Sequence, residues 1–225
     1  MLKKEIEKSK ELFEKILTDE TDGKLRQNFE EFRKLMTYYN CAMMEVETKF
    51  NVLNEEFSLR YDRNPITSVK SRLKTPQSIK GKLDRYNLSI SLESIESHLN
   101  DVAGIRVVCS FMQDVYTLAD AFLKQDDIQL IEMKDYIKNP KPNGYRSLHL
   151  IVAVPIYLQH EKKTMRVEIQ LRTIAMHTWA TLEHQLRYKK DHVFTDEMAI
   201  ELARCACLSA ELDEKMDKLR NDVKL

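Results

Sequence analysis

The chain has 225 residues, of which 43% are hydrophobic and 32% charged, and its 36 Lys and Arg residues balance 36 Asp and Glu residues. Zero net charge argues against a protein that coats nucleic acid through general electrostatics, so any anion site must be a local cluster. No apolar run approaches the ~20 residues that cross a bilayer, and the start MLKKEIEKSKELF is too charged for a signal peptide, so we expect a cytoplasmic protein without a membrane partner.

Residues 24–60 carry the clearest helical pattern in the chain. Apolar residues recur in steps of three and four from Phe29 to Phe57, with no Gly or Pro between them. This seam predicts one helix of roughly 50 Å, at 1.5 Å per residue. Two interpretations remain open, because the seam can pack across its own domain or be shared with another subunit.

The centre of the chain predicts alternating strands and helices. Strands are expected at 66–74, 105–111, 148–154 and 165–171, and helices from 76, at 113–125 and at 174–189. A second long helical stripe covers 198–223. The fold class is therefore α/β (α+β), with a mixed sheet of about five strands and long helices at both ends. We divide the chain into an N-terminal helical segment (1–60), a core (61–190) and a C-terminal helix (191–225), all within one domain.

Two acidic residues occur in patterns that suit a metal ion or a reacting hydroxyl. In TMRVEIQLRT, residues 164–173, strict alternation puts Glu168 on the polar face of a strand. In DVAGIRVVCSF, residues 101–111, Asp101 precedes a strand and Gly104 lets the backbone approach a ligand, which suits Mg²⁺. Each has a plain alternative, because the first can be a solvated sheet residue and the second a cap or turn aspartate.

Cations gather in SVKSRLKTPQSIKGKLDR, residues 68–85. Lys70, Arg72 and Lys74 share one strand face, and this strand leads into a helix N-terminus. Such an arrangement can hold phosphates, although a basic surface patch would look the same.

A stiff loop, KNPKPNGYRSLHL, occupies residues 138–150. Two prolines and Gly144 restrict it in advance, so binding would cost less ordering entropy. The ring of Tyr145 can stack on a base, and Lys138, Lys141 and Arg146 are expected to reach phosphates around it. Together with the two acids and the first cation cluster, this loop suits phosphoryl-type transfer between nucleotides.

This combination resembles the RelA/SpoT alarmone synthetases. The motifs that carry the resemblance are RxKxxxSxxxK at 72–82, DVAGIR at 101–106, KDYIKNPKPNGYRSLH at 134–149 and VEIQLRT at 167–173. They occur in the family's order over roughly residues 65–190. The chain length is similar to that of the small, synthetase-only members, and no His-Asp dipeptide of the hydrolase type is present. The resemblance implies a nucleotidyltransferase-like sheet.

The resemblance also implies a role for each motif residue. Asp101 and Glu168 would be the catalytic pair and the Mg²⁺ ligands, and Glu168 would activate the attacking hydroxyl. The ATP site would comprise Arg72, Lys74, Ser78, Lys82 and Arg106. The acceptor nucleotide site would comprise Lys134, Lys141, Tyr145, His149, Gln170 and His177. The last of these stands where related small synthetases carry asparagine, which bears on recognition of the guanine edge.

The implied activity is transfer of the β,γ-pyrophosphate of ATP to the 3′-hydroxyl of GDP or GTP, with GMP as a further acceptor. The products would be AMP and the alarmones of the stringent response, and the enzyme would be a homo-oligomer, as a tetramer. Two alternatives stay open: the same transfer onto another acceptor, such as the tRNA 3′ end or an adenine nucleotide, and a non-catalytic nucleotide or RNA binder. No stable nucleic-acid partner is expected, and RNA stays open as a regulator.

Overall fold

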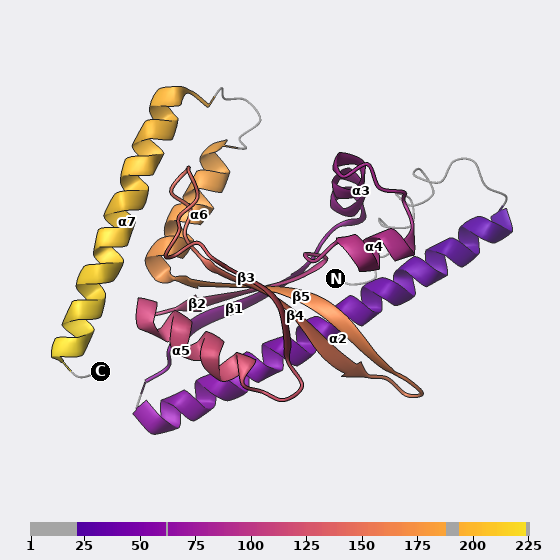
Figure 1. The fold of residues 1–225 in the computed structure, drawn as a ribbon, viewed down its shortest axis with the longest axis horizontal. Helices are drawn as coiled ribbons and strands as arrows, with labels where there is room; N and C mark the ends of the chain where they lie inside the picture. The colour runs from indigo at the N-terminus through magenta and orange to yellow at the C-terminus, as the bar shows by residue number, and fades with distance from the viewer. Residues whose placement is uncertain (1–21, 62, 188–193, 224–225) are drawn as a thin grey trace.

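The computed structural model describes residues 22–61, 63–187 and 194–223. Five strands form one sheet in the order β1-β2-β5-β4-β3, in which β2 and β5 are parallel and the other neighbours antiparallel. This mixed sheet with flanking helices confirms the predicted α/β (α+β) fold (Figure 1). The strand bounds are β1 Ile66–Leu73, β2 Ala103–Cys109, β3 Gln129–Asp135, β4 Leu148–Tyr157 and β5 Lys162–Thr173.

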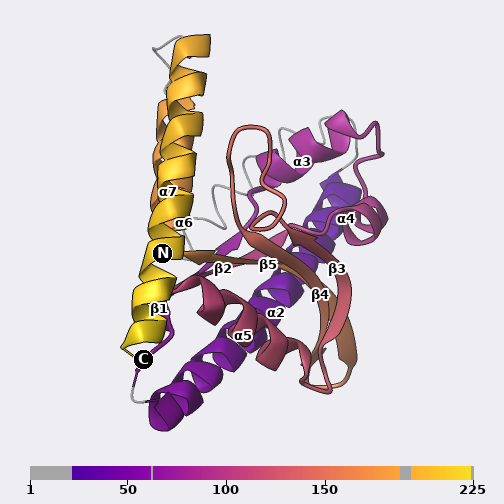
Figure 2. The same ribbon diagram turned by 60° about the vertical axis from the view of Figure 1, so that its left-hand side comes forward.

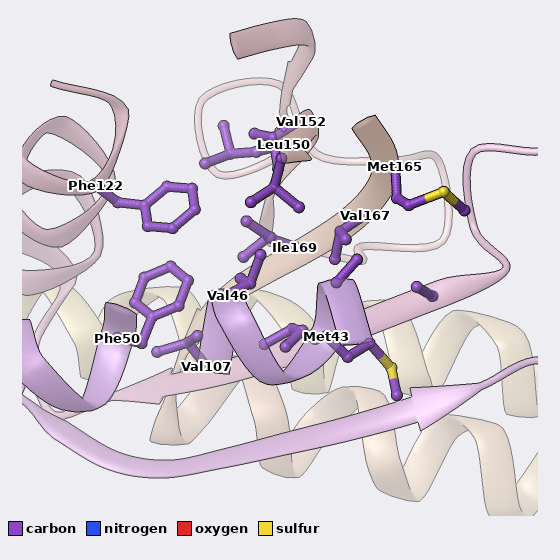
Figure 3. Packing of buried hydrophobic residues seen from close by; sticks show 14 of the residues in the cluster. Met43, Val46, Phe50, Val107, Phe122, Leu150, Val152, Met165, Val167 and Ile169 are labelled. Atoms are coloured by element: carbon purple, nitrogen blue, oxygen red, sulfur yellow. The ribbon is translucent and has the colours of Figure 1, made fainter. Parts of the chain in front are cut away.

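Helix α2 (Asp22–Tyr61) crosses one face of this sheet and forms the core with it (Figure 1). Val46 and Phe50 are completely buried against apolar side chains of the strands (Figure 3). Phe50 also stacks on Phe122 of α5 (Met112–Leu123), with ring centroids 4.6 Å apart. The predicted seam therefore packs in its own domain, and the alternative in which another subunit covers it is wrong.

The remaining helices lie toward the two ends of the sheet (Figure 1). Helix α3 (Pro76–Arg85) follows β1 directly, and its first turn is capped by Thr75, whose hydroxyl accepts a hydrogen bond from the Ser78 amide. Helix α6 continues from β5, and α7 runs alongside it, away from α3 (Figures 1 and 2). The bounds of these last elements are α4 Leu92–His98, α6 Ile174–Arg187 and α7 Asp196–Asp222.

Two elements are not located by the sequence pattern. Strand β3 is an edge strand with most of its side chains exposed, so QLIEMKD shows no apolar alternation. Helix α4 has only seven residues, which is too short for helical periodicity to be visible. The three-part division of the chain stays a prediction, and residues 1–21 of its first part lie outside the described residues. None of the described helices is both long and apolar enough to cross a membrane.

Candidate active site

Strand pairing gathers the predicted site residues on the sheet face opposite α2. Directly paired residues point to the same side of a sheet, so the register defines continuous rows of side chains. One row crosses all five strands through Lys70, Arg106, Gln170, His149 and Lys134. The adjacent row contains Arg72, Gly104 and Glu168. We call this surface the polar face.

Glu168, on β5, is held by its neighbours in the ionised form. The side-chain amide of Gln170 donates to Glu168 Oε2 at 3.1 Å, and His149 Nδ1 lies 3.6 Å from Oε1. Burial raises the pKa of this carboxyl, but the contacts with His149 and Gln170 outweigh burial and hold the pKa below its ordinary value. The carboxylate is therefore charged and available at neutral pH.

A network of polar contacts fixes the ring of Tyr145 beside Glu168. Arg172 donates both to the Tyr145 hydroxyl and to Gln170 Oε1, the latter at 2.7 Å. The Tyr145 hydroxyl also shares a 2.7 Å hydrogen bond with His149 Nε2, and Nδ1 of the same imidazole faces Glu168. The network returns to Glu168 through Gln170. Arg172 has no role in the sequence prediction, although the alternation along β5 already places it on the same face as Glu168.

Aromatic rings and one lysine extend this network over the loop. Lys141 Nζ lies 4.6 Å from the ring centroid of Tyr136 and 5.0 Å from that of Tyr145. Tyr136 also meets His149 edge to face, with centroids 5.2 Å apart. Tyr136 is a further residue that sequence reasoning missed, although it stands inside the KDYIKNPKPNGYRSLH motif. Lys134 sits at the border of this group, where it pairs with Glu132 at 2.9 Å.

Arg146 contradicts its sequence prediction. Its side chain is buried and donates from Nη1 to Asp213 Oδ2 of α7 at 3.0 Å. The expectation that Arg146 reaches phosphates is therefore wrong, because the guanidinium points into the packing between the loop and α7. Lys138 keeps an exposed side chain, with its ammonium 3.8 Å from Asp135.

A second cluster surrounds Asp101, between α4 and β2. Its carboxylate receives Lys74 Nζ at 2.6 Å and Lys82 Nζ at 2.8 Å. Burial raises the pKa of Asp101, but the two lysines outweigh it and lower the pKa below its ordinary value. Ser78, in the first turn of α3, accepts a hydrogen bond from the Thr75 hydroxyl at 2.9 Å. Two of the predicted ATP residues, Lys74 and Lys82, thus contact Asp101, and Ser78 lies in the first turn of the helix that carries Lys82.

Arg106 belongs to the first row of the polar face, and His177 lies in the first turn of α6. Arg106 Nε and His177 Nδ1 are buried and make no hydrogen bond within the described part of the chain. Burial, and after it the charge of Arg106, lowers the pKa of His177, so this imidazole is neutral at pH 7. Arg72 stands exposed on β1, opposite Gly104. All thirteen predicted site residues consequently border the polar face or the Asp101 cluster.

The two acids fit a Mg²⁺ ion. Asp101 Oδ1 is buried and, despite its ion pair with Lys82, makes no hydrogen bond within the described residues, so it has a lone pair to offer. The charge of Asp101 raises the pKa of Glu168, in opposition to His149 and Gln170. No group of three or more His, Cys, Asp or Glu side chains gathers in the described parts of the chain. Two carboxylates are enough, because Mg²⁺ commonly takes its other ligands from water and substrate phosphates.

Comparison with known proteins agrees with this geometry. Residues 71–193 match the model of the region found in RelA/SpoT proteins. The chain is 38% identical over 199 residues to the GTP pyrophosphokinase YwaC of Bacillus subtilis, covering 88% of this chain and 95% of that protein.

Solved structures give the same result. The B. subtilis small alarmone synthetase 1, bound to its product pppGpp, superposes with a TM-score of 0.78 at 32% identity, covering 87% of this chain and 99% of that one. A GTP pyrophosphokinase family protein of Streptococcus pneumoniae gives 0.77 at 35% identity, over 86% and 94% of the two chains.

Proposed function

This chain belongs to the RelA/SpoT family, as an alarmone synthetase of the small type with GTP pyrophosphokinase activity, and from that premise we propose its acceptor, its metal and the roles of its residues. It transfers the β,γ-pyrophosphate of ATP to the 3′-hydroxyl of GDP or GTP, with GMP as a further acceptor. A bond forms between the 3′-oxygen of the acceptor and the β-phosphorus of ATP. The bond from the β-phosphorus to the oxygen that bridges the α- and β-phosphates breaks, and AMP leaves with that oxygen. Its alarmone product serves the stringent response, and the enzyme acts in the cytoplasm.

The observation that carries this proposal is the network around Glu168. A charged carboxylate flanked by the Tyr145 ring can take the proton of a ribose hydroxyl whose base stacks on that ring. Because His149 and Gln170 hold Glu168 in place, little reorganisation is needed during the reaction. Lys134 and Lys141 then neutralise acceptor phosphates, and the neutral His177 is available to hydrogen-bond the guanine edge.

The donor nucleotide occupies the other end of the polar face. Lys74 and Lys82, which both pair with Asp101, bind the ATP phosphates together with Ser78 in the first turn of α3, where the helix N-terminus also favours anions. Arg72 and Arg106 hold the adenine between them. Gly104, which is paired with both Arg72 and Glu168, carries no side chain and so leaves space on the sheet surface between donor and acceptor. The protein itself does not require this glycine, because an added Cβ would make only an ordinary 3.6 Å contact with the Arg72 carbonyl oxygen.

Asp101 and Glu168 are the residues that would hold Mg²⁺. When bound, the ion would neutralise charge that develops on the transferred phosphates. Asp101 also pairs with the ammonium groups of Lys74 and Lys82, so positive charge would lie beside the phosphates at this position.

The catalytic assignment is tested with Asp101→Ala and Glu168→Ala, using labelled ATP, GDP and Mg²⁺. Both variants should form no AMP while they keep the wild-type far-UV circular dichroism spectrum. Glu96→Ala is the matched control, since this acid pairs with Lys163 at 2.6 Å and takes no part in the site. Turnover close to wild type in either site variant would refute the assignment.

The acceptor is tested by offering GDP, GTP, GMP, ATP and tRNA in parallel. We expect labelled pyrophosphate on the guanine nucleotides alone. Label on tRNA or on an adenine nucleotide would instead identify the alternative acceptor that the sequence leaves open.

We also propose a homo-oligomer, as a tetramer, although the α2 seam no longer supports it. The surface available for such contacts is the exposed apolar side of α7, where Leu208, Leu212, Met216 and Leu219 are between 44% and 63% exposed. Burying such a row usually requires a partner of similar character. A monomer by light scattering at micromolar concentration would remove this part of the proposal.

A further inference from the structure

Helix α7 packs directly against the loop between β3 and β4 that carries Tyr145, which we call the acceptor loop. Gly144 has a φ of +87°, and a Cβ on this residue would collide with the side chain of Ala206 in α7. From α6, the Trp179 indole donates to the Leu202 carbonyl of α7 at 2.9 Å. The acceptor loop and α6 are therefore both in direct contact with α7. Helix α7 begins after residue 193, where the match to the RelA/SpoT region ends.

One carboxylate of α7 contacts the chain beside two site residues at once. Asp213 accepts a hydrogen bond from Arg146 at 3.0 Å, and the two side chains are only 7% and 10% exposed. Thr173 is its second partner: burial raises the pKa of Asp213, and hydrogen bonding from Thr173 opposes that rise. Arg146 directly follows Tyr145, and Thr173 directly follows Arg172.

Tyr145 and Arg172, the residues that precede the two partners of Asp213, contact each other on the polar face. Arg172 donates to the Tyr145 hydroxyl, and its guanidinium lies 5.0 Å from the centre of the Tyr145 ring. Asp213 thus holds both halves of this contact from behind, through the next residue along each strand or loop. A buried ion pair contributes little net stability compared with apolar side chains of the same size. Its effect here is to fix geometry.

We infer that Asp213 is a positioning residue for the acceptor nucleotide: through Arg146 and Thr173 it holds the Tyr145 ring against Arg172. This inference rests on the proposed function, because it assigns Tyr145 to the acceptor. Within the part of the chain that the structure describes, the ATP residues Lys74 and Lys82 pair with Asp101 and not with Asp213. Loss of Asp213 should therefore affect the acceptor selectively.

The first test compares Asp213→Asn with Glu201→Gln. The control acid lies on the same helix, in an exposed pair with Arg204 at 3.1 Å. Asp213→Asn should raise KM for GDP about tenfold, the effect of one charge-assisted hydrogen bond, with KM for ATP unchanged. Glu201→Gln should change neither constant. An unchanged KM for GDP in Asp213→Asn, or an equal rise for both substrates, would overturn the inference.

A second measurement separates positioning from simple docking of α7. Trp179 is the single tryptophan of the chain and sits at the junction, so its emission reports whether α7 stays packed. The double variant Arg146→Met, Asp213→Leu replaces the ion pair with apolar side chains and should keep the wild-type emission and Tm. Its KM for GDP should still be raised. If the double variant recovers both Tm and the wild-type KM, the pair serves packing alone.

Calorimetric titration of GDP into wild type and Asp213→Asn keeps the two proposals distinguishable. If the wild-type chain forms no AMP with any acceptor, the proposed function fails, and the affinity for GDP then tests the inference by itself. Weaker GDP binding in Asp213→Asn supports the positioning role. Equal binding by both proteins refutes it, whatever the activity.

Discussion

The same substitution at two glycines should change stability in opposite directions. Gly144 has a left-handed backbone and faces Ala206, whereas Gly81 lies within α3 and an added Cβ there meets no atom within 4 Å. Alanine at position 144 would cost ~1–2 kcal/mol for the left-handed conformation and ~1–3 kcal/mol for overpacking against α7. Alanine at position 81 would gain ~0.5–1 kcal/mol, because glycine is a poor residue inside a helix.

Thermal unfolding measures both effects. For a chain of this size ~1 kcal/mol corresponds to a Tm change of ~2–4 °C, so Gly144→Ala should melt roughly 5–15 °C below wild type and Gly81→Ala a few degrees above it. Circular dichroism follows the whole fold, and the fluorescence of Trp179 follows the junction that Gly144 contacts. If Gly144→Ala melts with wild type, or below Gly81→Ala by less than about 2 °C, the close approach of loop and helix is wrong.

Cysteine reactivity, tyrosine titration and core packing give three further expected outcomes. A thiol reagent should label the exposed Cys205 and Cys207 in the folded protein but not Cys109, which is fully buried and whose thiol pKa burial raises; early label on Cys109 by mass spectrometry would contradict this. Burial raises the pKa of Tyr39 from 10.0 to about 12. Between pH 10.0 and about 12 the unfolded chain releases a proton that the folded chain keeps, so the free energy of unfolding should fall as the pH rises. Urea unfolding across this pH range should show the decrease, and Tyr39→Phe should show a smaller one. Phe50→Ala should cost ~3–5 kcal/mol in urea unfolding, since its ring is fully buried and stacked; a cost below ~1 kcal/mol would show that α2 is loosely attached.

The sequence predicts the elements whose pattern is local. The α2 seam, four of the five strands and the site motifs all depend on residues a few positions apart, and periodicity is visible at that range. Strand β3 is not predicted, because an edge strand with side chains exposed on both faces shows no alternation of apolar and polar residues.

Orientation in the acceptor loop could not be predicted in the same way. Lys141 and Arg146 look equivalent in the sequence, yet Lys141 lies over Tyr145 and Arg146 turns away from the nucleotide side. The deciding partner is Asp213, 67 residues further along the chain. Such outcomes depend on which helix face another element covers, and local pattern does not contain that information.

The position of β5 between a parallel and an antiparallel neighbour restricts how this enzyme can change during evolution. Insertion or deletion of a single residue in β5 before Glu168 would turn Glu168 into the apolar layer and bring Ile169 out, reversing every side chain beyond the change. Activity would then vanish in one mutational event, with no partially active intermediate. Length variation among descendants should instead concentrate at the β4–β5 hairpin tip, where Leu158 and Glu161 close the turn through a single 2.8 Å backbone hydrogen bond.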